Sequence, residues 1–137
     1  MGLYVSHDCW RGPYSAFHRW RCTLARILGI NLETMEGFEE QGNPRKGYGT
    51  KWEVLRPDPI HKLLRHSDCD GDISPVDAAL IAARLDEIIK GYEGKPDPGT
   101  MRGGSARADY DGFLPACKRF RDGLARAAAA NEVVKFG

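Results

Sequence analysis

The chain has no long apolar run. It contains no stretch of about 18 consecutive apolar residues, the length at which a helix can span a bilayer. Its first residues, MGLYV, also lack the basic region and the apolar stretch of a secretory signal peptide. We therefore expect no transmembrane helix, no membrane partner and a cytoplasmic protein.

Cysteine is sparse and irregularly spaced. Cys9, Cys22, Cys69 and Cys117 form no C-x-x-C pair and are spread over the chain. A small secreted scaffold held by disulfides needs a denser cysteine pattern. The sequence thus excludes that class and predicts reduced thiols, as in a cytoplasm.

A charge excess of one sign is also absent. The 20 Lys and Arg residues nearly balance the 19 Asp and Glu residues, and the formal net charge is +1. A nucleic-acid binder carries a basic excess overall or on one face, so only a local basic face could serve here. Such a face would consist of Arg19, Arg21, Arg26, Lys118, Arg119, Arg121 and Arg126. These charges are more often the solvated side of amphipathic helices, so the sequence does not favour nucleic acid as a partner.

The remaining composition is that of one globular domain. The chain has 137 residues, of which 42% are hydrophobic and 28% charged. Its 16 Gly and 8 Pro residues predict long turns between short elements. We expect a single domain over residues 1–137, with loops at 33–50 and 93–107.

Helical periodicity predicts three main helices, over residues 15–28, 74–92 and 112–130. Ser15 can cap the first helix, and Gly29 can end it. The apolar face of the second helix comprises Val76, Leu80, Ile81, Ala83, Leu85, Ile88 and Ile89.

The shorter elements complete the predicted fold. Asp58-Pro59 favours the start of a short helix. Residues 3–5 and 133–136 are β-prone and could pair as two terminal strands. We therefore predict an α+β fold, mainly helical, with three main helices, one short helix and a small terminal strand pair.

Residues 66–77, HSDCDGDISPVD, resemble the twelve-residue calcium loop of an EF-hand or a dockerin. In that resemblance Gly71 makes the sharp turn at position six, while His66 stands at position one in place of Asp. The implied ligands for Ca²⁺ or another divalent cation are Asp68, Asp70, Asp72, Ser74 and Asp77. Without a metal, the same residues favour a turn in which Ser74 caps the next helix. Both interpretations stay open.

The string H-x-D-x-D-G-D at His66–Asp72, followed by Ser74 and an Ala/Leu-rich helix, also resembles the first motif of DHH-type phosphoesterases. In that family the His and Asp residues bind manganese for phosphodiester hydrolysis. The resemblance implies an alternative function, a small metal-dependent hydrolase acting on a phosphate-containing substrate. The residues before His66, however, favour a helix where the family has a strand, and no Asp-His-His follows.

A second dense segment lies at residues 6–21, SHDCWRGPYSAFHRWR. The strings SHDCWRG and HSDCDG, with the closing pattern F-x-x-G-L-x-x-A…V-x-F at residues 120–136, resemble a family of small uncharacterised proteins of bacteria and their phages. The resemblance implies that the two His-Asp-Cys segments belong to one fold and could meet in space.

Such a meeting would surround one pocket with reactive side chains. A catalytic centre could use His7, Asp8 and His66, with a histidine as base and a carboxylate to orient it. In the hydrolase alternative Asp68 and Asp70 would join them around the metal. Cysteine could also serve as a nucleophile, or a zinc site could use Cys9, Cys69, His7 and His66.

The aromatic and basic residues of the same segment suggest a ligand site. Trp10, Arg11, Tyr14 and Arg19 could hold a nucleotide or another anion by stacking and by guanidinium forks. Alternatively, the tryptophans are core anchors and the cysteines are small buried residues.

His18 and Cys22 are four residues apart on one predicted helix, so they could ligate a metal on one helix face. Taken together, the sequence favours a non-enzymatic binding or regulatory module, phage-associated, with a cation site in the 66–77 loop. It identifies no partner; a protein or a nucleotide-like anion are the candidates.

Overall fold

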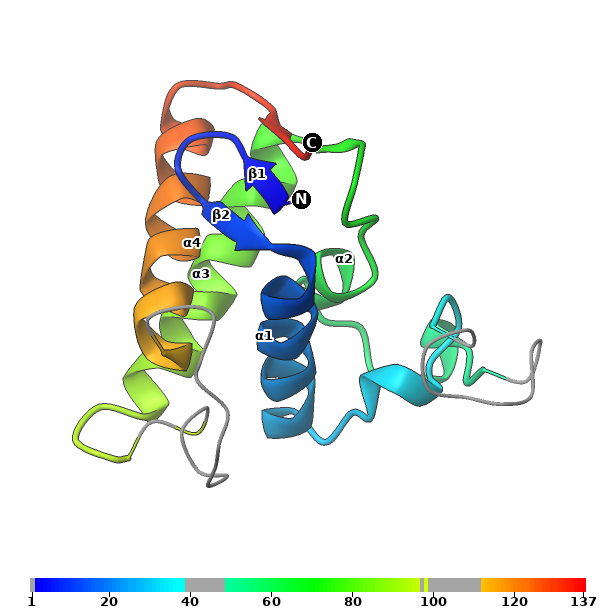
Figure 1. Ribbon diagram of the computed structural model, residues 1–137. Helices are drawn as coiled ribbons and strands as arrows, with labels where there is room; N and C mark the ends of the chain where they lie inside the picture. Colours follow the sequence, from blue (N-terminus) through cyan, green and yellow to red (C-terminus); the bar gives the residue numbers. More distant parts are fainter. Residues whose placement is uncertain (1, 39–48, 97, 99–111) are drawn as a thin grey trace.

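A computed structural model describes residues 2–38, 49–96, 98 and 112–137 of the chain (Figure 1). The elements in chain order are β1 Gly2–Val5, β2 Trp10–Pro13, α1 Tyr14–Ile27, the 3-10 helices η1 Leu32–Thr34 and η2 Trp52–Val54, α2 Ile60–Leu64, β3 Asp72–Ile73, α3 Pro75–Gly91, α4 Phe113–Ala129 and β4 Val134–Lys135. The predicted mainly helical α+β class, with three main helices and one short helix, is confirmed. No helix in this part of the chain is long and apolar enough to cross a bilayer.

Helices α3 and α4 run antiparallel side by side and make the most extensive contact between elements (Figure 1). Helix α1 contributes large aromatic rings that pack against α4. The ring of Trp20 stacks on Phe120 with centroids 5.1 Å apart, and Phe17 lies 6.3 Å from the same ring. All three side chains are fully buried, and burial of each contributes about 1.5–3 kcal/mol to stability.

Helix α3 begins as predicted, because the Asp77 amide donates to Ser74 Oγ at 3.1 Å. Its predicted apolar face is partly wrong. Val76 is 71% exposed and Leu80 51%, and Ala83 is exposed too. The buried face is Ala78, Ile81, Ala82, Leu85, Ile88 and Ile89. This stripe is narrower than the apolar pattern because α3 is covered on one side only.

Helix α1 begins at Tyr14 with Pro13 at the N-cap, so the predicted cap at Ser15 is wrong. Its predicted end at Gly29 is confirmed. Gly29 has φ +79°, a left-handed conformation that glycine adopts without steric cost. The amides of Gly29 and Ile30 then donate to the carbonyls of Arg26 and Ala25, at 3.0 and 2.9 Å. This pattern is a Schellman motif, and it turns the chain back so that η1 contacts α1.

The strands form two small antiparallel pairs, β1 with β2 and β3 with β4. A bridge between Val5 and Phe136 confirms the predicted contact between the terminal segments. The β1–β2 hairpin was not predicted. Its tip carries His7 and Asp8 at φ +61° and +60°, as a type I′ turn requires, although neither is the Asn or Gly that signals such a turn.

The predicted loops at 33–50 and 93–107 lie partly outside the described residues, which leave out 39–48, 97 and 99–107. The described ends of the first loop meet. The Glu36 amide donates to Thr50 O at 2.8 Å, and the Thr50 amide donates to Thr34 O at 2.9 Å. The segment after η1 is therefore anchored to the segment before η2.

Candidate functional site

The candidate site begins on helix α1, which places His18 and Cys22 one turn apart on the same face. The Cys22 thiol lies 3.4 Å from His18 Nε2. The His18 ring also stacks on Phe38, with centroids 6.1 Å apart, and this contact fixes its orientation. The i,i+4 spacing in the sequence indicated this pair.

Glu33 reaches the pair from η1. The Schellman turn at Gly29 reverses the chain after α1, and Glu33 Oε2 then lies 3.2 Å from the same His18 Nε2. The imidazole nitrogen, the thiol sulfur and a carboxylate oxygen all lie within 4.8 Å of one another. Across residues 2–38, 49–96, 98 and 112–137 this is the one group of three or more His, Cys, Asp or Glu side chains with that geometry.

The distances suit a tetrahedral metal ion. Zinc bonds of about 2.0–2.3 Å to N, O and S separate neighbouring ligand atoms by about 3.4–3.6 Å in a tetrahedron. The nitrogen of His18 lies 3.4 Å from the sulfur of Cys22 and 3.2 Å from the oxygen of Glu33. Small side-chain movements would therefore complete three coordination bonds and leave a fourth position open.

Without a metal, hydrogen bonds hold the group together. The pKa of the Cys22 thiol is raised to about 11, mainly by burial and also by Glu33, although Arg21 and Arg26 act to lower it. The thiol is thus protonated at neutral pH. A metal ion would displace this proton, so binding would be coupled to proton release.

A cavity of ≈ 440 Å³ lies beside this group. Two of the three candidate ligands, Cys22 and Glu33, are in its wall, and Arg26 and Asn31 add polar groups. The rest of the wall is Gly29, Ile30 and Leu32. A volume of this size is in the range of small-molecule sites, about 300–1,000 Å³.

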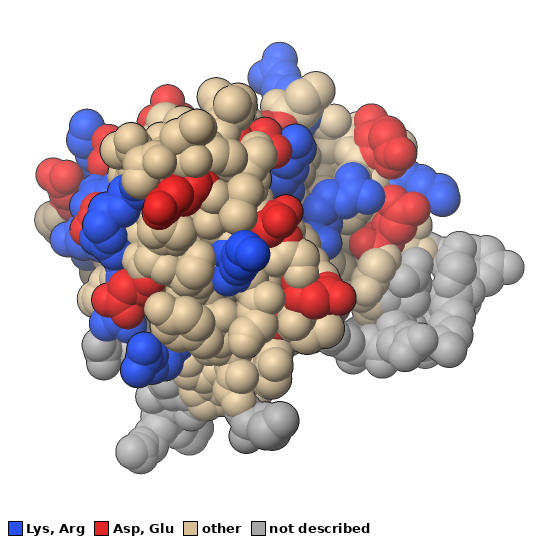
Figure 2. Space-filling model, turned by 90° about the horizontal axis from the view of Figure 1, so that it is seen from above, with Lys and Arg blue, Asp and Glu red and all other residues tan. Residues whose placement is uncertain are grey.

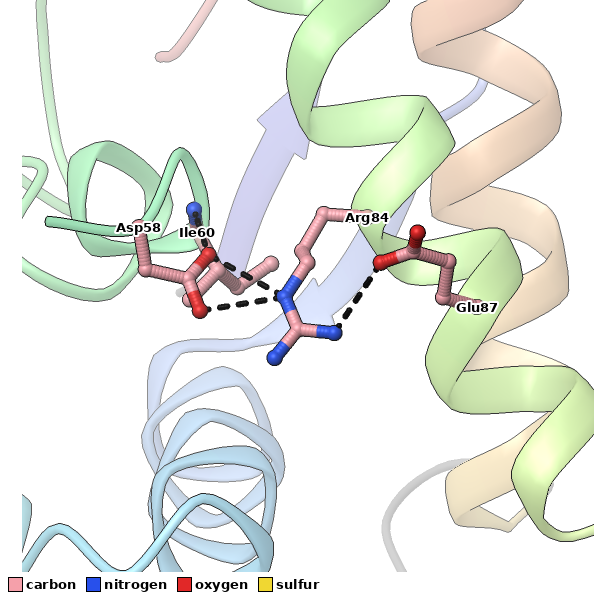
Figure 3. A network of polar contacts seen from close by, with 4 residues as sticks. All are labelled: Asp58, Ile60, Arg84 and Glu87. Atoms are coloured by element: carbon pink, nitrogen blue, oxygen red, sulfur yellow. Dashed lines mark hydrogen bonds and ion pairs between the residues drawn. The ribbon is translucent and has the colours of Figure 1, made fainter.

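A second cavity of ≈ 260 Å³ adjoins the first, since Gly29 and Ile30 line both. Asp58 and Arg84 stand in its wall and form the network of Figure 3. The Arg84 Nε donates to both carboxylate oxygens of Asp58, at 3.2 and 3.0 Å, and its Nη1 donates to Glu87 at 3.1 Å. The guanidinium is thus held between two carboxylates and ties the start of α2 to α3.

The 66–77 loop has the element order of a calcium loop, with α2 before it, β3 within it and α3 starting at its end. Gly71 has φ +91°, the sharp turn expected at position six. The His66 ring stacks on Phe136 with centroids 4.0 Å apart, and its nitrogens contact the carbonyls of Ser67 and Asp72 at 2.8 and 3.0 Å. A metal at either ring nitrogen would replace one of these contacts.

The predicted cation ligands of the loop differ in exposure and in their contacts. Asp70 and Asp72 are exposed, and Asp68 is half-buried. The Asp77 carboxylate accepts from Lys62 Nζ at 2.8 Å, and Ser74 is occupied as the cap of α3. No three of the carboxylates of Asp68, Asp70, Asp72 and Asp77 bring their oxygens within 4.8 Å of one another, and the cation site stays a prediction.

The two His-Asp-Cys segments lie on opposite edges of the C-terminal strand. The Ser6 amide donates to Lys135 O at 2.9 Å, and the Phe136 amide donates to Gly71 O at 3.0 Å. This strand therefore connects the segments. The ligand atoms of His7, Asp8, His66, Asp68 and Asp70 form no group of three.

His7 belongs to a polar chain at the hairpin tip. Its Nδ1 lies 2.9 Å from Ser6 Oγ, and its Nε2 lies 2.8 Å from Glu132 Oε1. Hydroxyl, imidazole and carboxylate stand in the order of a catalytic relay. However, Ser6 Oγ also accepts from the Lys135 amide at 2.8 Å, so the chain fastens the hairpin to the C-terminal segment.

The predicted ligand-binding residues are divided between core and surface. Trp10 is 3% exposed and packs on Phe17 and Trp20, which makes it a core residue. Arg11 is exposed and lies over the Tyr4 ring at 5.1 Å. Tyr14 is half-buried, and Arg19 is exposed.

The cysteines of the two His-Asp-Cys segments, Cys9 and Cys69, differ in exposure. Cys9 is fully buried, whereas Cys69 is exposed. Burial raises the pKa of the Cys9 thiol to about 12, which disfavours the thiolate that a nucleophile or a zinc ligand needs.

The surface charge is mixed in sign. Figure 2 shows Lys and Arg interspersed with Asp and Glu over the face seen from above. Arg21, one member of the predicted basic face, is only 3% exposed, so its assignment to a solvated helix side is wrong.

Comparison with known proteins adds no relative from which a role could be transferred. The chain matches no protein-family model, no curated protein and no solved structure.

Proposed function

We propose that the protein is a non-enzymatic binding module that takes a divalent transition-metal ion, of which Zn²⁺ is the best fit, at His18, Cys22 and Glu33. The observation that supports this most directly is the single nitrogen of His18 facing both the sulfur of Cys22 and the oxygen of Glu33, at 3.4 and 3.2 Å.

The ligand types favour zinc over calcium. Ca²⁺ takes six to eight oxygen ligands, whereas a set of one N, one S and one O matches the preferences of Zn²⁺.

A binding role is favoured over hydrolysis by the contacts of the other histidines. His7 and His66 both hold structural contacts to the C-terminal segment, as described above. We extend the proposal to a cytoplasmic, phage-associated setting, because Cys22 must be reduced to bind a metal and because SHDCWRG and HSDCDG resemble bacterial and phage proteins.

Zinc titration of the reduced full chain tests the proposal. We expect one Zn²⁺ per chain by calorimetry. The unfolding midpoint should also rise, because binding adds about 2.7 kcal/mol to the free energy of unfolding at a hundredfold excess over Kd. Cys22→Ser should weaken binding by more than about tenfold. Cys69→Ser, which removes an exposed thiol outside the site, should not. Equal losses in the two variants, or no binding by the wild type, would overturn the proposal.

A second candidate is a divalent cation in the 66–77 loop. It is supported by the turn at Gly71 and by the strand pairing of Ile73 with Val134, because Ile73 occupies position eight, where a calcium loop forms its short strand. Ca²⁺ should raise the unfolding midpoint of the wild type but not of Asp70→Ala. The matched control is Glu53→Ala, which removes an exposed carboxylate outside the loop. Identical shifts in both variants would reject this site.

A further inference from the structure

We infer that the cavity beside His18, Cys22 and Glu33 binds a small carboxylate, which supplies the fourth ligand of the metal and pairs with the Arg26 guanidinium. This inference rests on the proposed metal site and names the class of ligand that the site would take.

The open coordination position would face the cavity. Three protein ligands leave one position of a tetrahedral ion for an exogenous group. Cys22 and Glu33 are in the wall of the ≈ 440 Å³ cavity, while His18 approaches the same point from outside that wall. A metal bound by all three therefore lies at the cavity edge and can accept a ligand from within it.

With the metal bound, the cavity wall carries one net positive charge, which an anion would neutralise. The Cys22 thiolate and the Glu33 carboxylate together neutralise a divalent ion, and His18 binds a metal as a neutral ligand. Arg26 then adds one positive charge to the same wall. One carboxylate would neutralise the cavity, with one oxygen on the metal and the other on the guanidinium.

Arg26 is placed for this role. It lies four residues after Cys22 on α1, so both side chains project from one helix face. Both residues also line the ≈ 440 Å³ cavity, so the guanidinium and the thiol border the same space. The planar guanidinium matches the geometry of a carboxylate better than a lysine ammonium would.

The rest of the wall limits the body of the ligand. Ile30 and Leu32 are buried apolar residues in the cavity wall, and Asn31 between them brings an amide. The ligand should therefore combine one carboxylate with a short apolar body, for which butyrate is a suitable probe.

The experiment uses the full chain loaded with Co²⁺, whose visible absorption reports its coordination. Butyrate should change this absorption in a saturable manner, and 1-butanol, its neutral counterpart, should not. Arg26→Gln should raise the butyrate Kd about tenfold, as expected for loss of a charge-assisted hydrogen bond. Arg65→Gln, which removes an exposed arginine at the end of α2 and outside the cavity wall, should leave the Kd unchanged.

The outcomes separate the two proposals. If cobalt binds but its spectrum ignores butyrate, or if the response does not depend on Arg26, the carboxylate inference is wrong and the metal site stands. If the reduced chain does not bind cobalt at all, both proposals fall. Cobalt affinity is measured first in each variant, so that a weaker metal site is not mistaken for a weaker ligand site.

Discussion

The guanidinium of Arg21 donates through Nη1 to the carbonyl oxygen of His66 at 2.7 Å, and also to the carbonyls of Leu63 and Leu64 at 3.2 and 3.0 Å. The Leu63 and Leu64 carbonyls belong to the C-terminal end of α2, where a helix lacks intrahelical partners, and His66 follows that end. Burial lowers the pKa of Arg21 to about 10, which still leaves the side chain charged at neutral pH. One buried cation on α1 thus holds the end of α2 and the entry to the 66–77 loop.

Replacement of Arg21 by methionine should destabilise the protein strongly. The change puts an apolar side chain of similar length in the core but removes the guanidinium that donates to the carbonyls of Leu63, Leu64 and His66, at a cost of about 3 kcal/mol. Urea unfolding measures the loss. Lys118→Met, which removes an exposed cation of α4, should change stability by no more than about 0.5 kcal/mol. Similar losses in the two variants would show that Arg21 is not a structural anchor.

The role of Arg21 marks the limit of sequence-based prediction for this fold. Helical periodicity predicted α1, α3 and α4, because apolar spacing within one helix reports the face that it buries. The same pattern assigned Arg21 to a solvated face. Its partners are carbonyls at least 42 residues away, and their positions depend on tertiary packing. Val76 and Leu80 show the opposite error. Their apolar side chains predicted burial, but they are exposed because they lie beyond the contact area of α3.

Of the two carboxylates that bind Arg84, Asp58 should contribute more to stability than Glu87 (Figure 3). It accepts from the Ile60 amide at 3.0 Å as well as from Arg84, and its side chain is 19% exposed, against 70% for Glu87. We expect Asp58→Ala to cost about 2 kcal/mol, from the lost helix-start contact and the ion pair. Glu87→Ala should cost less than about 0.5 kcal/mol. Thermal unfolding of both variants compares them, and equal effects would contradict this ranking.

Only part of the candidate metal site could be predicted from the sequence. The four-residue spacing of His18 and Cys22 places them together on any helix, so the pair was predictable. Glu33 was not, because it reaches the pair only after the turn at Gly29 and the 3-10 turn that follows. The 66–77 loop shows the opposite case. Its acidic spacing resembles a calcium loop, yet Asp77 is paired with Lys62.

Gly123 should tolerate no side chain. A Cβ built at this position of α4 would lie 2.5 Å from Cys9 Sγ and 2.8 Å from His7 O, so the hairpin tip could not stay in contact with the helix. We expect Gly123→Ala to cost about 1–3 kcal/mol or more. Gly91→Ala is the matched control, because nothing lies within 4 Å of its Cβ position. That change should stabilise α3 by up to about 1 kcal/mol. Opposite signs in urea unfolding are the expected result, and destabilisation by both would argue against the close contact.

The buried thiol of Cys9 should make the fold sensitive to alkali. Burial raises its pKa from 9.0 to about 12, the nearby Arg126 opposes this, and Asp8 adds to it. Because the folded state holds the proton more tightly than the unfolded state, this contribution to stability is full below pH 9 and is lost as the pH rises toward 12. The loss follows a slope of about 1.4 kcal/mol per pH unit.

Replacement of Cys9 by alanine should remove this slope while adding a cost that does not depend on pH. The difference in unfolding free energy between wild type and Cys9→Ala should therefore shrink between pH 9 and pH 11. Urea unfolding at several pH values measures it. Cys69→Ala, at an exposed thiol, should run parallel to the wild type over the same range. If the Cys9→Ala curve also runs parallel, the thiol is not kept protonated by burial, and the alkaline loss must come from other groups.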